Sequence, residues 1–189
     1  MTKPTLFMIK IGAKPQGRLI EQHDIFFGMA NQISELIPAV NRHWAEVAGK
    51  WHFDAYRPVT VVDGYKIEWQ KQKSTDDNGL KLFFINLGGY LPNEFEEFHH
   101  KLLVVANTQA EAVKKAKQSQ FYQSYTCVEE GSQAIATSHV DDKMQVDVDD
   151  IYDVNGLLSH GALKITPLKD KQVEQDKSVI GYISLKSFK

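Results

Sequence analysis

The 189-residue chain lacks the features that mark several large classes of protein. Cys127 is its single cysteine, so an intrachain disulfide is excluded, and this fits a reducing compartment. No apolar run approaches the roughly 18 to 20 residues that span a bilayer. Residues 1–12 also lack the apolar core and cleavage site of a secretory signal. The sequence therefore predicts a cytoplasmic protein with no membrane as partner.

An excess of charge of either sign is also missing. The chain has 22 Lys and Arg residues against 24 Asp and Glu residues, which gives a formal net charge of −2. Nonspecific binding of nucleic acid needs a basic face that displaces counterions. We therefore do not expect a nucleic-acid partner. Hydrophobic residues make up 42% of the chain, which is typical of a globular protein with a buried core.

The motifs of two common ligand sites are absent as well. Gly12 and Gly88 end apolar runs, but neither opens a G-x-G-x-x-G or a P-loop pattern, so we interpret them as turn glycines. The acidic stretch DVDDIYDVNG (147–156) fails the EF-hand pattern. Counting back from Gly156 places Ile151 where the loop needs its first Asp. A solvated strand end is the better interpretation.

What the sequence does contain is an internal repeat. LFMIKIGAKPQGRLIEQHD (6–24) returns as LFFINLGGYLPNEFEEFHH (82–100), at an offset of 76 residues. The alignment runs without a gap from the Leu6/Leu82 pair to the Asn41/Lys117 pair. Nine of these 36 pairs are identical, whereas ordinary residue frequencies give about two or three. We interpret the repeat as the duplication of one structural unit.

Each copy predicts the same order of elements: strand, strand, helix and hairpin. LFMIKIG and LFFINLG predict the first strands, and IFFGMA and LLVVA predict the second. Helical spacing then begins, with Asn31 as the expected N-cap in copy one and a Thr108–Glu111 capping box in copy two. We expect Pro38 to kink or split the first helix.

The hairpin is predicted by Asp63–Gly64, which lies between the alternating runs of VTVVDGYKIEW. Its counterpart in copy two is IATSHVDDKMQVDV, with Val140 in the place of Val62. The fold class predicted from this repeat is α+β, with two copies related by a pseudo-twofold axis and a mostly antiparallel sheet. The expected division is 1–73 for the first repeat, 74–81 for a linker, 82–151 for the second repeat and 152–189 for C-terminal closing strands.

These motifs resemble those of a known bacterial family. The repeated LFxIxxG, the E-x-H downstream and the VDGY turn are similar to the uncharacterised family called domain of unknown function 1543. In that family the matching segment occurs in one or two copies. The resemblance runs from residue 6 to about residue 70 and again from residue 82 to about residue 150. It implies no assigned activity or cofactor. Copy two reads VDDK for VDGY and HH for HD, so a site in one copy can be degenerate in the other.

Glu21, His23, Glu97 and His99 are the candidate site residues. Residues two apart on a strand point to one face, so each Glu-x-His pair can converge on one point. Two Glu and two His residues would suffice for a Zn, Mn or Fe site. In the structural alternative, each Glu accepts backbone N–H bonds at a loop start while its His fixes the turn. Retention in both copies fits this alternative at least as well.

Neighbouring polar residues have other expected roles. Asp24 and His100 face away from the Glu-x-His pairs if their strands are regular. His52 and Asp54 form another pair at period two. We expect this pair either to supply a second layer of contacts to a site or to make a hydrogen bond at the surface.

Two classes of function follow from the sequence. The first is a noncatalytic module that binds a small molecule or another protein, and it leads because no nucleophile–base pattern is present. The second is a metal-dependent enzyme, such as a hydrolase, that uses the two Glu-x-His pairs as ligands or acid/base groups. No substrate or cofactor can be named. We expect a homodimer, because cyclic dimers are the commonest way to cover an unpaired strand edge.

Overall fold

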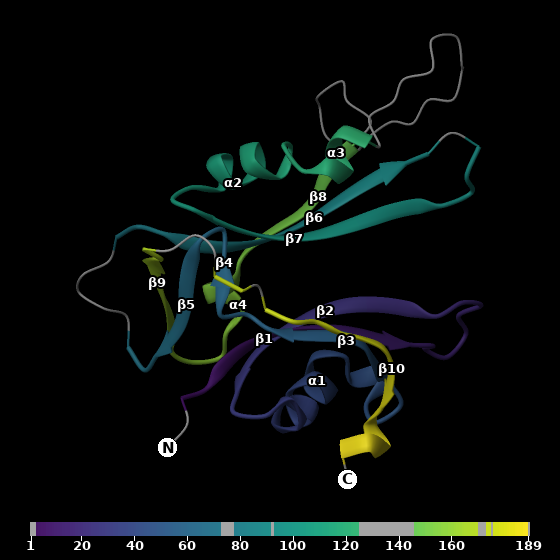
Figure 1. Cartoon of the computed structure of the whole chain (residues 1–189). Helices are drawn as coiled ribbons and strands as arrows, with labels where there is room; N and C mark the ends of the chain where they lie inside the picture. Colours follow the sequence, from purple (N-terminus) through teal and green to yellow (C-terminus); the bar gives the residue numbers. More distant parts are fainter. Residues whose placement is uncertain are drawn as a thin grey trace. The chain divides into compact units, whose positions relative to one another are not determined.

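The chain forms two compact units in a computed structural model that describes residues 3–72, 78–91, 93–124, 146–169, 173–174 and 176–188. Unit 1 consists of residues 1–75 and 158–189, and unit 2 consists of residues 76–157. Each unit combines antiparallel strands with short helices (Figure 1), so the α+β class is confirmed. The C-terminal strands belong to unit 1.

The main sheet of unit 1 has four antiparallel strands in the order β10-β3-β1-β2. Its strands are β1 (Thr5–Ala13), β2 (Gln22–Ala30), β3 (His52–Pro58) and β10 (Val179–Ser184). A smaller sheet contains β4 (Val61–Val62), β5 (Tyr65–Gln70) and β9 (Ala162–Pro167). The expected hairpin is confirmed between β4 and β5. Asp63 and Gly64 have φ angles of 53° and 79° there, as a type I′ turn requires.

Unit 2 has one three-stranded antiparallel sheet in the order β7-β6-β8. Its strands are β6 (Lys81–Tyr90), β7 (Glu97–Ala106) and β8 (Val146–Asp153). Residues 135–145 of the hairpin expected in copy two lie outside the described residues. Residues 146–148 begin β8, which pairs with β6 as β3 pairs with β1. Their prediction as the counterpart of β5 is therefore wrong, because they take the place of β3.

The helices are short in both units. They are η1 (Ile33–Leu36), α1 (Ile37–His43), η2 (Ala45–Val47), α2 (Gln109–Ala116), α3 (Gln120–Ser124), α4 (Val154–Leu157) and η3 (Leu185–Phe188). Pro38 lies in the first turn of α1, directly after the 3₁₀ helix η1, so the expected split of the first helix is confirmed. No helix in the described part of the chain is long and apolar enough to cross a membrane.

Alternate residues of the first strand of each unit form its core. Ile9 and Ile11 of β1 are fully buried with Val40 of α1, and α1 covers this face of the sheet (Figure 1). In unit 2, Ile85 and Leu87 of β6 pack in the same way against residues of α2. One face of each sheet is therefore apolar and covered by helix. The other face is mixed: Leu82, Phe84 and Val105 are buried on it in unit 2, whereas in unit 1 it carries His23 and His52.

A β-bulge interrupts β3 where it pairs with β1. Phe53 pairs with Ile11, and Ala55 pairs with Lys10, so Asp54 is an extra residue in β3. The register of β6 and β8 shifts at the corresponding step of the repeat, 76 residues further along the chain. Both units therefore share strand order, strand direction and the place of this irregularity.

Two pairs of identical residues in the repeat make the same hydrogen bond. The Asn31 N–H donates to Glu35 Oε2 at 3.0 Å, and the Asn107 N–H donates to Glu111 Oε2 at 2.9 Å. Thr108 Oγ1 also accepts from the Glu111 N–H, so the capping box is confirmed, with its carboxylate reaching one residue further upstream. The prediction of Asn31 as an N-cap is wrong, because the cap position falls one residue later.

Candidate metal centre

Three neighbouring strands of unit 1 bring two histidines together. Gly12 of β1 pairs with His23 of β2 on one side and with His52 of β3 on the other. Paired residues on adjacent strands project from the same face of a sheet. Ile11, the neighbour of Gly12, points into the core. Both imidazoles therefore emerge on the face opposite the core, with Gly12 between them.

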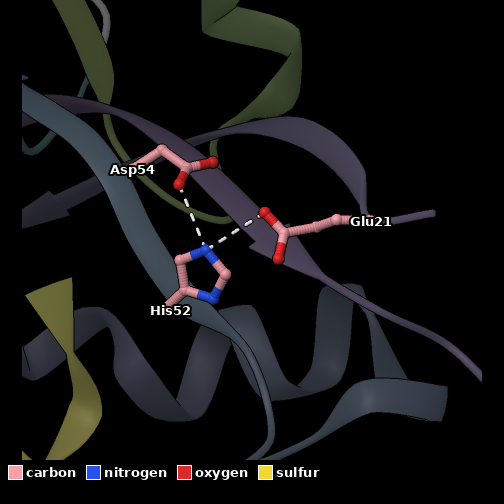
Figure 2. A group of neighbouring side chains, drawn as sticks. All are labelled: Glu21, His52 and Asp54. Carbon is pink, nitrogen blue, oxygen red and sulfur yellow. Dashed lines mark hydrogen bonds and ion pairs between the residues drawn. The ribbon is translucent and has the colours of Figure 1, made fainter. Parts of the chain in front are cut away.

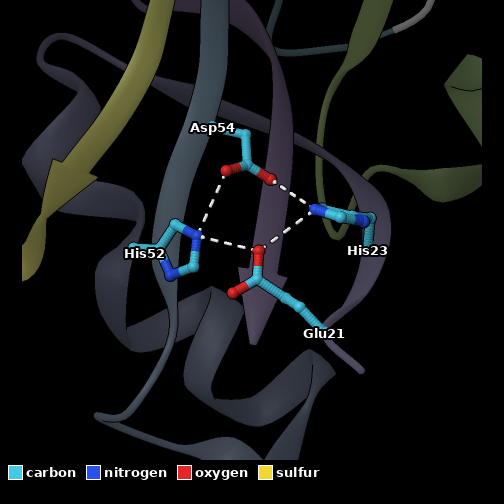
Figure 3. A network of polar contacts seen from close by, with 4 residues as sticks. All are labelled: Glu21, His23, His52 and Asp54. Carbon is cyan, nitrogen blue, oxygen red and sulfur yellow. Dashed lines mark hydrogen bonds and ion pairs between the residues drawn. The ribbon is translucent and has the colours of Figure 1, made fainter. Parts of the chain in front are cut away.

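Two carboxylates complete the cluster, which we call the donor ring: Glu21, His23, His52 and Asp54 (Figure 3). His23 Nε2 lies 3.2 Å from Glu21 Oε1 and 3.1 Å from Asp54 Oδ2. His52 Nε2 lies 3.3 Å from the same Glu21 oxygen and 3.1 Å from Asp54 Oδ1. Glu21, His52 and Asp54 each present one ligand atom within 4.8 Å of the others (Figure 2).

Hydrogen bonds explain only one of the close contacts within the donor ring. Of its four nitrogen–oxygen contacts, the one between His52 Nε2 and Asp54 Oδ1 has hydrogen-bond alignment. Asp54 Oδ2 is shielded from solvent and has no hydrogen bond with any described residue, although His23 Nε2 is close to it. A buried carboxylate oxygen without a donor is costly. A cation at the centre of the ring would remove this cost.

Gly12 provides the space that the donor ring encloses. A Cβ at this position would lie 2.7 Å from both Asp54 Oδ2 and His52 Nε2, and 3.0 Å from Glu21 Oε1. Gly12 lies within β1, and its φ is outside the left-handed region. The interpretation of Gly12 and Gly88 as turn glycines is therefore wrong, because both are strand residues. At Gly12 the missing side chain leaves room for Glu21, His52 and Asp54.

The spacing of Glu21, His52 and Asp54 suits metal coordination, because their ligand atoms all lie within 4.8 Å of one another. His23 contacts Glu21 and Asp54 but lies outside this group of three. Metal–ligand distances of 2.0 to 2.2 Å place neighbouring donors about 3.0 Å apart in an octahedron and about 3.4 Å apart in a tetrahedron. The four observed separations run from 3.1 to 3.3 Å. Two imidazoles with two carboxylates form a donor set suited to Zn, Fe or Mn rather than to Ca or Mg.

One side of the donor ring is buried and the other is open to solvent. The His52 side chain is 8% exposed, whereas Glu21 and His23 are 42% and 41% exposed. The Tyr182 ring of β10 lies 4.2 Å from the His52 ring, centroid to centroid. His52 is thus held between the sheet and a tyrosine, while the opposite donors remain accessible.

The second Glu-x-His pair lies in unit 2 and has a looser geometry. His99 Nε2 is 3.8 Å from Glu97 Oε2, which is too long for a hydrogen bond. Gly88 pairs with His99 on β7, as Gly12 pairs with His23, but its partner on β8 is Asp147 where Gly12 has His52. A joint site of Glu21, His23, Glu97 and His99 across the two units stays a prediction.

Residues next to the two pairs face the helices, as expected from strand alternation. Asp24 Oδ2 lies 2.7 Å from His43 Nε2 of α1, and the His100 ring stacks on Phe121 of α3 at 5.2 Å. Partial burial lowers the pKa of His100, and the charge of Lys101 lowers it further. Asp24 and His100 therefore lie on the helix-covered face of their sheets.

Comparisons with known proteins relate this chain to proteins without an assigned activity. A family model described as Domain of Unknown Function (DUF1543) matches residues 18–69. This segment resembles that family. It contains all four residues of the donor ring, from Glu21 to Asp54. No curated protein matches the chain.

A solved structure shares the fold. It is the crystal structure of a protein Il1583 from Idiomarina loihiensis, with a TM-score of 0.66 and 22% sequence identity. The match covers 97% of this chain and 99% of the other. At this identity the likeness concerns the fold alone.

Proposed function

We propose that unit 1 is a metal-binding module that holds one transition-metal dication in the donor ring. The observation that carries the proposal is the convergence of two imidazoles and two carboxylates around the gap left by Gly12. Only one of their four contacts is a hydrogen bond. Repeated structural hydrogen bonds would align each N–H with its acceptor, whereas a metal site aligns lone pairs with a common centre.

The exposure of the donor ring favours a working metal over a purely structural one. Structural zinc sites are closed by four protein ligands, whereas catalytic sites keep a position for water or substrate. Glu21 and His23 are each about two-fifths exposed, so a ligand from solvent can reach the metal beside them. A bound dication lowers the pKa of a coordinated water, which makes hydrolysis the most accessible reaction class. The proposal thus places the metal-dependent class above the noncatalytic module.

The metal proposal is tested by metal content and calorimetry on the full chain. The purified protein, stripped with a chelator, should bind about one equivalent of Zn²⁺ or Co²⁺ per chain. The His23→Ala/His52→Ala variant should lose this binding while it still folds. If the unmodified protein binds two equivalents of metal and this variant still binds one, the remaining metal is bound elsewhere, for example at Glu97 and His99.

His43→Ala is the matched control. His43 also pairs with a carboxylate, on the opposite face of the same sheet, and its side chain is 40% exposed against 41% for His23. The control should lower stability without changing metal stoichiometry. If the protein binds no metal, or if His43→Ala loses as much metal as the His23→Ala/His52→Ala variant, the donor ring is a structural network and the proposal fails.

We also infer that the two units arose by duplication. The sequence repeat supports this at an offset of 76 residues, and so do the shared strand order, the shared bulge and the repeated Asn–Glu hydrogen bond. Superposition of residues 6–50 on residues 82–126 in an experimental structure is the test. Glu21 should then coincide with Glu97.

Assembly and location complete the proposal. We propose a cytoplasmic homodimer. β10 is an edge strand of its described sheet, so its outer edge offers backbone N–H and C=O groups with which a second copy can pair. Light scattering at micromolar concentration should give twice the mass of the 21.5 kDa chain, and a monomeric mass counts against the dimer.

A further inference from the structure

Apolar side chains flank the donor ring on two sides. On one side Leu19 and Ile20 directly precede Glu21, and both are highly exposed. On the other side Tyr182 and Ile180 project from β10, which is hydrogen-bonded to β3. Large exposed apolar residues scattered singly need no explanation, but a group of them beside a polar cluster marks an interaction site.

Tyr182 has the geometry of a platform for a flat ligand. Its ring is tilted by 34° to the His52 ring at a centroid distance of 4.2 Å, so one face packs on a residue of the donor ring. The side chain nevertheless remains 74% exposed. Tyr182 thus contacts His52 with one face, and its other face and its edge are open to a bound molecule.

The charge of the donor ring restricts the group that such a molecule can bring. Glu21 and Asp54 carry two negative charges that a dication neutralises, so a metal-loaded site has no large excess of either sign. A monoanionic group with two oxygens suits this site, because it can take the open coordination positions without adding strong repulsion. The donor ring contains no Lys or Arg among its four residues, so it has no side chain to balance the additional negative charge of a polyanion such as a phosphate ester.

We propose that the site binds a small aromatic molecule that bears a monoanionic pair of chelating oxygens, with its ring on Tyr182 and its oxygens on the metal. The inference rests on the proposed metal-binding function, because the chelating group needs the metal. It goes further by naming the ligand class and a residue, Tyr182, that selects it. Leu19 and Ile20 provide an apolar border on the side opposite Tyr182.

Two hydroxamates with the same chelating group test the selection. Benzohydroxamate carries a phenyl ring, whereas acetohydroxamate carries a methyl group. Their affinities are measured by calorimetry on the Zn²⁺-loaded full chain, and free Zn²⁺ provides the reference ratio. We expect the protein to favour benzohydroxamate by at least about threefold beyond that reference, since aromatic stacking contributes roughly a factor of two to ten.

Tyr182→Phe and Tyr182→Leu separate stacking from simple apolar burial. The phenylalanine variant keeps the ring and should keep the preference, whereas the leucine variant should reduce it to the reference ratio. Both variants should still bind one metal ion, because Tyr182 is not in the donor ring and its side chain is mostly exposed.

The outcomes distinguish the two proposals. A chain that binds no Zn²⁺ contradicts the metal site itself. A metal-loaded chain that binds neither hydroxamate has no open coordination position, and this overturns the ligand inference alone. The same inference is also overturned if the preference is absent in the unmodified protein or survives unchanged in Tyr182→Leu.

Discussion

Replacing Gly12 with alanine separates metal binding from folding. The added Cβ would lie 2.7 Å from Asp54 Oδ2 and from His52 Nε2. Favourable contacts between nonbonded heavy atoms are about 3.5 Å, so each donor must retreat by roughly 0.5 Å or more. Metal sites tolerate deviations of only about 0.2 Å in ligand distance. The substitution should therefore disable at least two of the four ligands.

The expected loss of metal affinity is large, and the expected loss of stability is small. Two displaced ligands should weaken Zn²⁺ binding at least about 100-fold, which corresponds to about 2.8 kcal/mol. The atoms that the new methyl group displaces are the ends of side chains, and Glu21 can move into solvent. Removing a glycine from a strand also gains about 0.5 to 1 kcal/mol. Because the buried His52 ring must also shift, overpacking offsets this gain, and we expect the metal-free variant to lose at most about 2 kcal/mol of stability.

Gly28→Ala provides the control for a new methyl group in the same sheet. Its Cβ would lie 2.7 Å from Leu36 Cδ2, in the apolar core rather than in the donor ring. This variant should lose about 1 to 3 kcal/mol of stability through overpacking and should keep its affinity for metal. Urea denaturation of the metal-free proteins and calorimetric Zn²⁺ titration measure the two quantities. A Gly12→Ala variant that binds Zn²⁺ as tightly as the original protein would refute the coordination geometry proposed here.

Three further predictions concern stability. Asp176→Ala should lower the free energy of unfolding by about 1 to 3 kcal/mol in urea denaturation, because Asp176 accepts hydrogen bonds from the Thr60 N–H and hydroxyl. The lowered pKa of His100 means that folding favours its neutral imidazole. The contribution of His100 to the free energy of unfolding should be complete above pH 6.5 and lost as the pH falls through the lowered pKa. His100→Phe should abolish this pH dependence of the melting temperature. The pKa of Glu111 is lowered chiefly by its bond from the Asn107 N–H, so that stabilisation should be present above pH 4.5 and disappear on acidification through the lowered pKa. Glu111→Gln should flatten this acid limb.

The strands could be predicted from the sequence because their signals are local. β1, β2, β6 and β7 contain continuous apolar runs, and the two-residue Asp63–Gly64 turn fixes its own hairpin. The position of β8 beside β6 depends on pairing between distant segments, which no local pattern specifies. These four strands and the hairpin were therefore accessible. β3, which carries His52 and Asp54, was not predicted, and neither was the topology of unit 2.

Half of the donor ring could be found from the sequence, for a related reason. Glu21 and His23 were marked by their recurrence as Glu97 and His99. His52 was expected only to support a site or to make a surface hydrogen bond. It lies about thirty positions from Glu21 in the chain and approaches it only because β3 pairs with β1, which the sequence does not reveal. The role of Gly12 could not be predicted, because the sequence does not distinguish a glycine that leaves space for neighbouring side chains from one that forms a turn.

The bulge at Asp54 interrupts the alternation of side chains between the two faces of β3. Phe53 and Tyr56 both pack against the core, although they are three residues apart and a regular strand would send them to opposite faces. The extra residue absorbs this change of phase, so that Tyr56 returns to the core face while His52 and Asp54 share the other face. Anyone who transplants the four donors into another protein must therefore transplant an irregular strand. On a regular strand, His52 and Asp54 would share their face with Tyr56, which would then leave the core.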